Sequence, residues 1–270
     1  MRQVSVAVAQ MMPKLNAFEE NLDLMGEMIA NICKGQKIDL IVFPELATSG
    51  YECGVRFTDL AQTIPGHAVN VIAQRASEFN VHILFGMPVK ARVESIIYDG
   101  AVLIGPDGEV LGDYHKVHLR GAERMVFRPG FRFPVFETYF GMLGVLVGWD
   151  LAFPEATRSL ALDGIDLLAV CANWETPHEE EWHAYLMARA FENSLFIAAA
   201  NRIGEEPSFK FFGESTILGP RGEVFAAVDT GVEGYGQAKI DLDQVKQNRE
   251  EFQLLQYRQP LAYRNVVRKY

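Results

Sequence analysis

The 270-residue sequence has little of what marks membrane, disulfide-rich or nucleic-acid-binding proteins. No apolar run approaches the roughly 20 residues that a membrane-spanning helix needs. The three cysteines, Cys33, Cys53 and Cys171, are too few and too scattered for a disulfide framework or a zinc site. Lysine and arginine number 25 against 35 acidic residues. That balance argues against a nucleic-acid partner, which usually meets a basic surface.

Cofactor and targeting motifs are lacking as well. No GxGxxG follows a strand and no P-loop is present, so we expect no cofactor. The N-terminal stretch MRQVSVAVAQMMP alternates in polarity and lacks a small-residue cleavage site, so it predicts a first strand rather than a signal peptide. Together with cysteines that we expect to be reduced, this indicates a cytoplasmic protein.

Apolar residues make up 49% of the chain, which is enough for a sizeable core. Their periodicity predicts alternating strands and helices. Asn16 is expected to cap the first helix, which runs to Ile32. The other predicted helices cover 68–79, 154–162 and 179–193, with a polar helix after the last strand. The predicted strands cover 4–11, 38–43, 81–85, 96–104, 109–114, 143–147, 167–171, 195–200, 215–218, 223–228 and 235–240.

Two similar hairpins divide the pattern into halves. LIGPDGEVLG at 103–112 and ILGPRGEVFA at 217–226 each place a Gly-Pro-x-Gly turn between strands. Each hairpin follows a stretch of alternating strands and helices, so we expect two mixed sheets, each with helices on its outer face. Packed face to face, these sheets make an α/β fold, a four-layer α-β-β-α sandwich. With no Pro/Ser-rich linker, residues 1–270 are expected to form a single domain.

The stretch GVLVGWDLAFPE at 144–155 predicts a strand, a sharp turn and the start of a helix. Many α/β enzymes present a nucleophile on such a turn. Here no Ser, Cys or Thr precedes Trp149, and Gly148 stands at the position that would carry the nucleophile.

Polar residues at other predicted strand ends are candidates for catalysis, because ligands of open α/β sheets bind there. Glu45 follows an apolar run, where desolvation would raise its pKa toward that of a useful base, although it could also be a surface acid. Lys116 could pair with Glu45 or stabilise an oxyanion, or be a solvated lysine. Glu123 could add a second carboxylate. His115 and His118 form an HxxH pair without a third ligand nearby, so we expect no metal.

Further residues are candidates for substrate binding. Asn173 and Trp174 follow the strand predicted over 167–171. Tyr51, Trp149 and Trp174 could form aromatic walls of a pocket or equally pack in the core.

Several blocks, in order, resemble those of the nitrilase (carbon–nitrogen hydrolase) family, and the resemblance runs from about residue 4 to 240. The blocks are VFPELATSGY (42–51), DYHKVHLRGAERMVFRPG (113–130), GVLVGWDLAFPEATR (144–158), ANWETPHEEEWHAYLMARAFEN (172–193), AANRIG (199–204) and FGESTILGPRGEVFA (212–226).

The resemblance implies a Glu–Lys–Cys site. It gives the general base to Glu45, the oxyanion-stabilising lysine to Lys116 and a second carboxylate to Glu123. The cysteine nucleophile falls on Gly148. Family members attack an amide, carbamoyl or nitrile carbon through the thiolate. The short chain is more similar to the compact amidase and carbamoylase branches, which implies a small-molecule amide or N-carbamoyl substrate.

The resemblance also implies assembly. Family members have the α-β-β-α fold and are commonly homodimers. It therefore predicts a homodimer or a higher homo-oligomer, with the tail over about 241–270 in a dimer contact.

Three interpretations of Gly148 are open. The glycine could be an engineered replacement, an active-site mutant that traps substrate in an inactive enzyme. It could be native, with Glu45 activating a water directly. The chain could also be a non-catalytic protein that binds a small amide or a partner. Rescue by Cys171 is disfavoured because its place in the strand is structural, and Cys53 could line the pocket but nothing orients it against a base.

Overall fold

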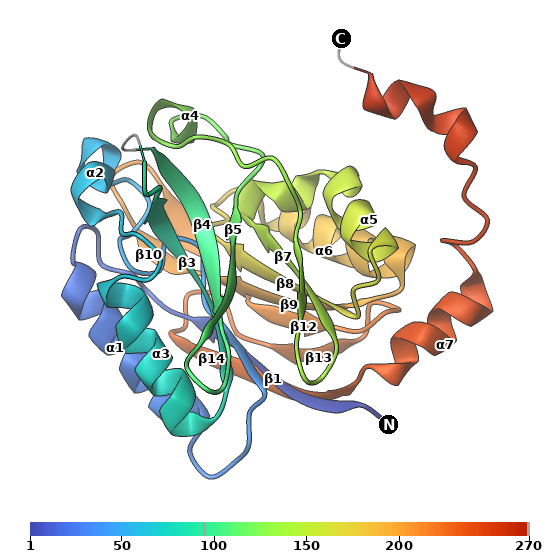
Figure 1. The fold of residues 1–270 in the computed structure, drawn as a ribbon, viewed down its shortest axis with the longest axis horizontal. Coiled ribbons are helices and arrows are strands. Elements are labelled where there is room, and N and C mark those ends of the chain that lie inside the picture. Colours follow the sequence, from blue (N-terminus) through green and yellow to red (C-terminus); the bar gives the residue numbers. More distant parts are fainter. Residues whose placement is uncertain (94–95, 269–270) are drawn as a thin grey trace.

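The structure, a computed structural model, describes residues 1–93 and 96–268. Within these residues the chain forms two six-stranded sheets that pack face to face, with helices on the outer face of each sheet (Figure 1). Each sheet contains both parallel and antiparallel neighbours. The predicted α-β-β-α sandwich of two mixed sheets is thereby confirmed.

The first sheet has the strand order β14-β1-β2-β3-β4-β5. Its neighbours β1, β2 and β3 run parallel, and the remaining pairs are antiparallel. Helices α1 (Phe18–Ile32) and α3 (His67–Phe79) cover its outer face. The strands are β1 (Gln3–Gln10), β2 (Leu40–Val42), β3 (His82–Lys90), β4 (Ile97–Ile104), β5 (Val110–His115) and β14 (Gly234–Asp241).

The second sheet has the strand order β13-β12-β9-β8-β7-β6. Its central strands β7, β8 and β9 are parallel. Helices α5 (Pro154–Leu162) and α6 (Glu179–Asn193) cover its outer face. The strands are β6 (Val135–Glu137), β7 (Met142–Val147), β8 (Leu167–Ala172), β9 (Phe196–Asn201), β12 (Thr216–Leu218) and β13 (Val224–Ala227).

Shorter elements connect these layers and surround the site. They are the 3₁₀ turns η1 (Gly54–Arg56) and η2 (Gly148–Ala152), the one-turn helices α2 (Phe57–Leu60) and α4 (Glu123–Val126), and a small ribbon of β10 (Ile203–Glu205) and β11 (Lys210–Phe212).

The alternation of side chains along β1 shows how the four layers are filled. Val4, Val6 and Val8 point into the space between the two sheets, whereas Ala7 and Ala9 point toward α1 and α3. Successive side chains of a strand lie on opposite faces. Because both faces of each sheet are covered, the central strands are apolar throughout, as their sequences are.

The start of the first helix differs from the prediction. α1 begins after Ala17 and has no side-chain cap, so the prediction that Asn16 caps it is wrong. Asn16 instead adopts a left-handed φ of 59°, and its backbone N–H donates to the carbonyl of Ser49 at 2.8 Å. This bond ties the helix start to the loop that follows Glu45. Both predicted hairpins are present, as β4–β5 and β12–β13.

The C-terminal part leaves the sandwich. Helix α7 (Asp243–Phe252) buries Val245 against the core, and the segment after it, including η3 (Pro260–Val267), extends away from the body (Figure 1). Six large apolar side chains of this segment are exposed: Leu254, Tyr257, Leu261, Tyr263, Val266 and Val267. Its role in a dimer contact stays a prediction.

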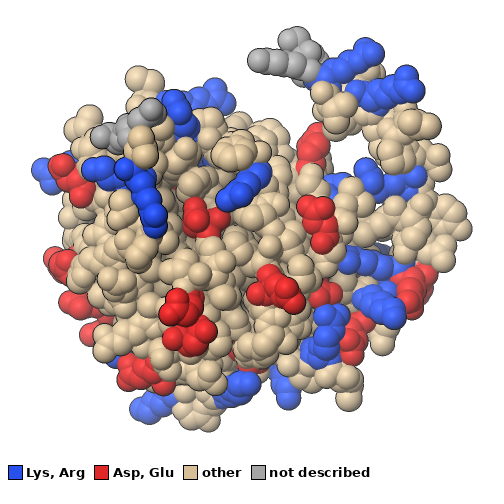
Figure 2. Space-filling model, in the orientation of Figure 1, with Lys and Arg blue, Asp and Glu red and all other residues tan. Residues whose placement is uncertain are grey.

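The surface mixes charges of both signs. Figure 2 shows acidic and basic side chains interspersed over one face of the body, with several basic side chains on the C-terminal segment. Of the helices in the described part of the chain, none has the length and apolar character to cross a membrane.

Candidate active site

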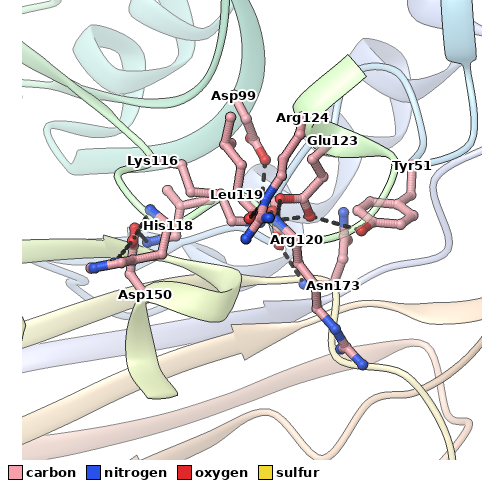
Figure 3. Close-up of polar contacts among 12 residues, drawn as sticks. Tyr51, Asp99, Lys116, His118, Leu119, Arg120, Glu123, Arg124, Asp150 and Asn173 are labelled. Carbon is pink, nitrogen blue, oxygen red and sulfur yellow. Dashed lines mark hydrogen bonds and ion pairs between the residues drawn. The ribbon is translucent and has the colours of Figure 1, made fainter. Parts of the chain in front are cut away.

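The residues predicted for the site line one small cavity at the carboxyl ends of strands from both sheets. Figure 3 shows Tyr51, Lys116, Glu123 and Asn173 of this set. Glu45 lies just beyond β2, and Lys116 directly follows β5. From the second sheet, Gly148 directly follows β7 and Asn173 directly follows β8. Parallel strands end at the same edge of a sheet, so packing the two sheets face to face brings these loop residues together.

The Lys116 ammonium group lies at the centre of the site. Its Nζ donates to Oε1 of Glu45 at 2.6 Å and to Oε1 of Glu123 at 2.8 Å, and it lies 3.5 Å from Oδ2 of Asp99. All four side chains are buried. Burial alone would lower the pKa of Lys116, but Glu123, Glu45 and Asp99 together raise it well above its usual value. The lysine is therefore a buried cation that its acidic neighbours hold in place.

Asp99 places a third carboxyl group beside the single ammonium group of Lys116. Three carboxyl groups surround the ammonium group, which pairs with only part of their charge. Burial first, and then the charge of Glu45, raise the pKa of Asp99 well above its usual value, which favours the protonated form of this residue. Sequence reasoning missed Asp99. The available signal was an acidic residue inside the apolar run 96–104, since strands seldom hold aspartate.

Glu45 has the environment of a general base. Burial raises the pKa of its carboxyl group, against the opposing effect of Lys116. Oε2 accepts the backbone N–H of Asn173 at 2.9 Å, which fixes the orientation of the carboxylate. A carboxylate with a raised pKa accepts protons more readily near neutral pH.

Gly148 opens the turn after β7 in a conformation that favours glycine. Its φ is +45°, in the left-handed region that other residues adopt with strain. A Cβ added there would lie 2.4 Å from Oε2 of Glu45, closer than real Cβ contacts, and 3.0 Å from the other two carboxyl atoms. The Glu45 carboxyl group thus occupies the space in which a side chain at position 148 would begin.

Asp150 joins this turn to the loop that carries Lys116. Its Oδ1 accepts the backbone N–H of His118 at 2.8 Å and lies 2.8 Å from that ring's Nδ1. Its Oδ2 accepts the hydroxyl of Tyr114 at 2.6 Å. Asp150 is fully buried, and these bonds fix the position of Gly148 relative to Lys116.

The histidines of the HxxH pair and the three carboxyl groups around Lys116 are the groups that could bind a metal ion. His115 lies 2.8 Å from a carboxylate oxygen of Asp113, and His118 faces Asp150, so the two histidines of the HxxH pair have separate partners. The three carboxyl groups around Lys116 have oxygens within 4.8 Å of one another, a spacing that suits a cation. The lysine ammonium group is the cation that they surround.

Tyr51 connects the Glu45 loop to the second carboxylate. Its hydroxyl donates to Oε1 of Glu123 at 2.7 Å. The backbone N–H groups of Tyr51 and Glu52 donate to the carboxylate of Glu206 at 3.0 Å and 2.6 Å. Glu206 pairs with Arg202, and both side chains are almost fully buried. Sequence reasoning missed this buried ion pair, which holds the Tyr51 loop although it lies about 150 residues further along the chain.

Two adjoining cavities lie over the site. The smaller has a volume of about 10 Å³, which is close to the space of a single water position. All residues predicted for the site line it: Glu45, Tyr51, Lys116, Glu123, Gly148, Trp149, Asn173 and Trp174.

The larger cavity has a volume of about 380 Å³. Arg120 and Glu175, which form an ion pair at 2.6 Å, line both cavities. The larger cavity has mostly apolar walls, which include Phe57, Val126, Phe127 and Phe209. This size and lining suit a small organic molecule.

Trp149 and Trp174 each line the small cavity and also pack against another aromatic side chain. Trp174 lines the small cavity and also packs against Trp182, with ring centroids 5.7 Å apart. Trp149 lines the same cavity and meets Phe153 edge-to-face at 5.1 Å.

Cys53 and Cys171, the two cysteines considered as substitutes for the missing nucleophile, are poorly placed for catalysis. The thiol of Cys53 donates to the carbonyl of Ser49 at 3.1 Å, and burial raises its pKa to about 11. Within the described part of the chain Cys53 lies outside the lining of both cavities. Cys171 is fully buried between the sheets, where burial raises its pKa well above the usual value. A raised pKa suppresses the reactive thiolate.

Comparison with known proteins agrees with this fold. Residues 5–250 match the family model described as carbon-nitrogen hydrolase. Since this match covers most of the chain, the chain belongs to the carbon–nitrogen hydrolase family, within the nitrilase superfamily.

Curated relatives cover most of the chain. A probable nitrilase of Schizosaccharomyces pombe is 40% identical over 98% of this chain and 99% of its own length. A 2-oxoglutaramate amidase of Bacillus subtilis is 33% identical over 78% of this chain and 82% of its own. An N-carbamoylputrescine amidase of Solanum lycopersicum is 29% identical over 90% and 88%.

Solved structures share the fold. A carbon-nitrogen hydrolase from Helicobacter pylori G27 has a TM-score of 0.89 and 24% identity over 99% of both chains. A variant of the amidase from Nesterenkonia sp. AN1 has a TM-score of 0.81 and 26% identity over 94% of this chain and 97% of its own. It is described as showing covalent addition of the acetamide moiety of fluoroacetamide at the active site cysteine.

Proposed function

We propose that this hydrolase binds a small-molecule amide or N-carbamoyl compound and that its route through a covalent acyl-enzyme is closed at Gly148. The substrate's amide group would lie at the small cavity, with the rest of the molecule in the larger one. Lys116 would stabilise the developing oxyanion. Glu45 would act as general base, and Glu123 would hold Lys116.

One observation carries this proposal. The lysine, both glutamates and the turn at Gly148 face one cavity, with Lys116 donating to both carboxylates. Amidase and carbamoyl-amidase relatives support the choice of bond. The set is complete apart from a nucleophilic side chain, and this is what replacement of a cysteine by glycine, as in an engineered substrate trap, would leave.

Ammonia release from a panel of small amides and N-carbamoyl compounds tests the proposal. The chain would be assayed beside Gly148→Cys, with nitriles included for comparison. Release only by Gly148→Cys is expected, because the variant restores the thiol. Binding without release by the unchanged chain completes the expected pattern. If neither protein binds or cleaves any compound, the proposal fails and a non-catalytic role is favoured.

A second candidate function is direct hydrolysis by water. The observation that favours it is the cavity of about 10 Å³ beside Gly148 and Glu45, which is large enough for one water. Glu45 would then take a proton from that water as it attacks the substrate carbonyl. Ammonia release by the unchanged chain, abolished in Glu45→Gln, is the expected result for this route. Unchanged turnover in Glu45→Gln would refute it.

The assembly and location are also proposals. The exposed apolar side chains of the C-terminal segment support a homodimer contact. The small number of scattered cysteines supports a cytoplasmic location. Light scattering of the full chain beside a variant that ends at residue 252 tests the homodimer contact, with a dimer expected only for the full chain. Fluorescence microscopy of the tagged chain tests the cytoplasmic location.

A further inference from the structure

A third cavity is formed mostly by the segment that follows Lys116. Its volume of about 530 Å³ lies within the usual range for sites that bind small molecules. It shares Phe127 with the larger cavity described above and Trp149 with the smaller one. None of the residues to which we give a catalytic role lines it. The third cavity is therefore a neighbour of the proposed catalytic centre and not a part of it.

The walls of the third cavity are largely aromatic. The ring of His118 stacks on Phe153, with centroids 3.6 Å apart and an angle of 8° between the planes. Nδ1 of His118 lies 2.8 Å from a carboxylate oxygen of Asp150, which holds the ring in place. Trp149 and the buried Phe127 complete these walls. Rings fixed in this way suit a ligand with a flat apolar body.

Arg124 adds a positive charge to this cavity. Its Nε donates to the carbonyl of Leu119 at 2.8 Å, which positions the guanidinium group (Figure 3). No aspartate or glutamate is among the described residues that line the cavity. This is unusual in a chain with 35 acidic and 25 basic residues. A guanidinium group held at an apolar wall without an acid beside it suits a carboxylate, which it can bind through two parallel hydrogen bonds.

We propose that the third cavity binds a small aromatic monocarboxylate. The ring of the ligand lies against the aromatic walls, and its carboxylate accepts hydrogen bonds from the guanidinium group of Arg124. One guanidinium group balances one negative charge, so a dicarboxylate or a phosphate dianion would leave a charge unpaired beside apolar walls. The ligand is bound and not hydrolysed, because the cavity holds none of the proposed catalytic groups. The inference thus does not depend on the proposed function.

Calorimetric titration of the unchanged chain with three ligands tests the proposal. Cinnamate has both an aromatic body and a carboxylate, cinnamyl alcohol has only the aromatic body, and acetate has only the carboxylate. We expect cinnamate to bind at least about tenfold more tightly than either other ligand, because the apolar walls and the charge both contribute. Its affinity is expected to fall as salt is added, since Arg124 is exposed to solvent.

Variants of two neighbouring arginines separate the charge from the fold. Arg124→Gln is expected to weaken cinnamate binding about tenfold and to leave cinnamyl alcohol nearly unaffected. Arg124→Lys keeps the charge without the paired donors and should give an intermediate affinity. Arg128→Gln is the matched control, because Arg128 is an exposed arginine of the same segment that lines none of the three cavities. It should bind cinnamate as the unchanged chain does.

A further variant distinguishes the third cavity from the catalytic one. Arg120→Gln removes the arginine that lines both catalytic cavities, and it is expected to leave cinnamate binding unchanged. Loss of binding in Arg120→Gln, with binding kept in Arg124→Gln, would place the carboxylate in the larger cavity and overturn the proposal. Equal affinity for cinnamate and cinnamyl alcohol would overturn it too.

Light scattering in the same buffer identifies a competing occupant. A chain that is dimeric and binds no cinnamate would mean that a second copy covers the third cavity, and a monomeric chain that binds none would mean that the cavity takes no such ligand. Either result overturns the proposal. Both leave the proposed function standing, because the amide assay concerns the other two cavities.

Discussion

The carboxyl group of Glu45 lies against Gly148, in the space that a Cβ at position 148 would take. Lys116 and the backbone of Asn173 hold the carboxyl group there. Position 148 is therefore sterically coupled to the proposed general base. Any side chain introduced at this turn has to displace a carboxylate that two hydrogen bonds fix.

Gly148→Ala is expected to destabilise the protein more than a change in backbone conformation alone explains. The alanine meets both the left-handed φ and the Glu45 carboxyl group. Gly54→Ala is the matched control, because Gly54 has a φ of +53° and nothing within 4 Å of an added Cβ. We expect Gly148→Ala to cost about 1–3 kcal/mol more than the control in urea unfolding. Equal costs would show that Glu45 moves freely.

Lys116→Met is expected to lower the free energy of unfolding by about 3–5 kcal/mol, because it leaves the buried carboxylates without their cation. Part of the loss should be recovered at low pH, where those groups take up protons. Urea unfolding at about pH 5 and pH 8 measures both effects. Lys246→Met removes an exposed lysine and should change stability by less than about 0.5 kcal/mol. A similarly small effect at Lys116 would contradict the buried ion cluster.

Asp99→Asn is expected to alter the pH dependence of stability. The pKa of Asp99 is raised by burial in the folded chain, whereas the unfolded residue has its ordinary pKa of about 3.9. Between these two pKa values the folded state binds more protons. The free energy of unfolding therefore falls as pH rises, by up to about 1.4 kcal/mol per pH unit for this group.

Asparagine carries no titrating proton, so the stability of Asp99→Asn should fall less steeply than that of the unchanged chain as the pH rises above about 3.9. Unfolding in urea at each pH gives the two curves. Asp23→Asn, on the exposed face of α1, is the control and should run parallel to the unchanged chain. Parallel curves for Asp99→Asn as well would mean that Asp99 is ionised in the fold.

Glu206→Gln is expected to loosen the loop that carries Tyr51. The change leaves Arg202 buried without its acid and weakens the bonds to the backbone N–H groups of Tyr51 and Glu52. We expect a loss of about 3–5 kcal/mol in stability, with faster hydrogen exchange at those two amides. Glu205→Gln affects an exposed pair with Lys210 and should leave both readouts nearly unchanged.

The layers of the fold and the positions of the main site residues follow from local sequence patterns. Alternating apolar runs identify the buried strands, and Glu45, Lys116 and Gly148 stand at strand ends, where α/β proteins gather ligands. Asn16 shows the limit of local signals. Its residue type favours a helix cap, but the loop after Glu45 draws its backbone into a left-handed turn.

The sequence does not reveal contacts between distant side chains. Glu205 and Glu206 are adjacent glutamates, yet one lies on the surface and the other is buried against Arg202. The contact of Glu45 with Gly148 joins residues about a hundred positions apart and depends on how the two sheets pack. Such packing has no periodic signature along the chain.

We propose that a complete amide-hydrolase site surrounds Gly148 and lacks only the nucleophile. Intact-mass measurement of quenched reactions with a primary amide tests it most directly, with the unchanged chain, Gly148→Cys and Gly148→Cys combined with Glu45→Gln. We expect one acyl group on residue 148 in Gly148→Cys, a slower rise in the double variant and no adduct on the unchanged chain. An active unchanged chain, or a Gly148→Cys protein that binds amide without forming any adduct, would contradict the claim.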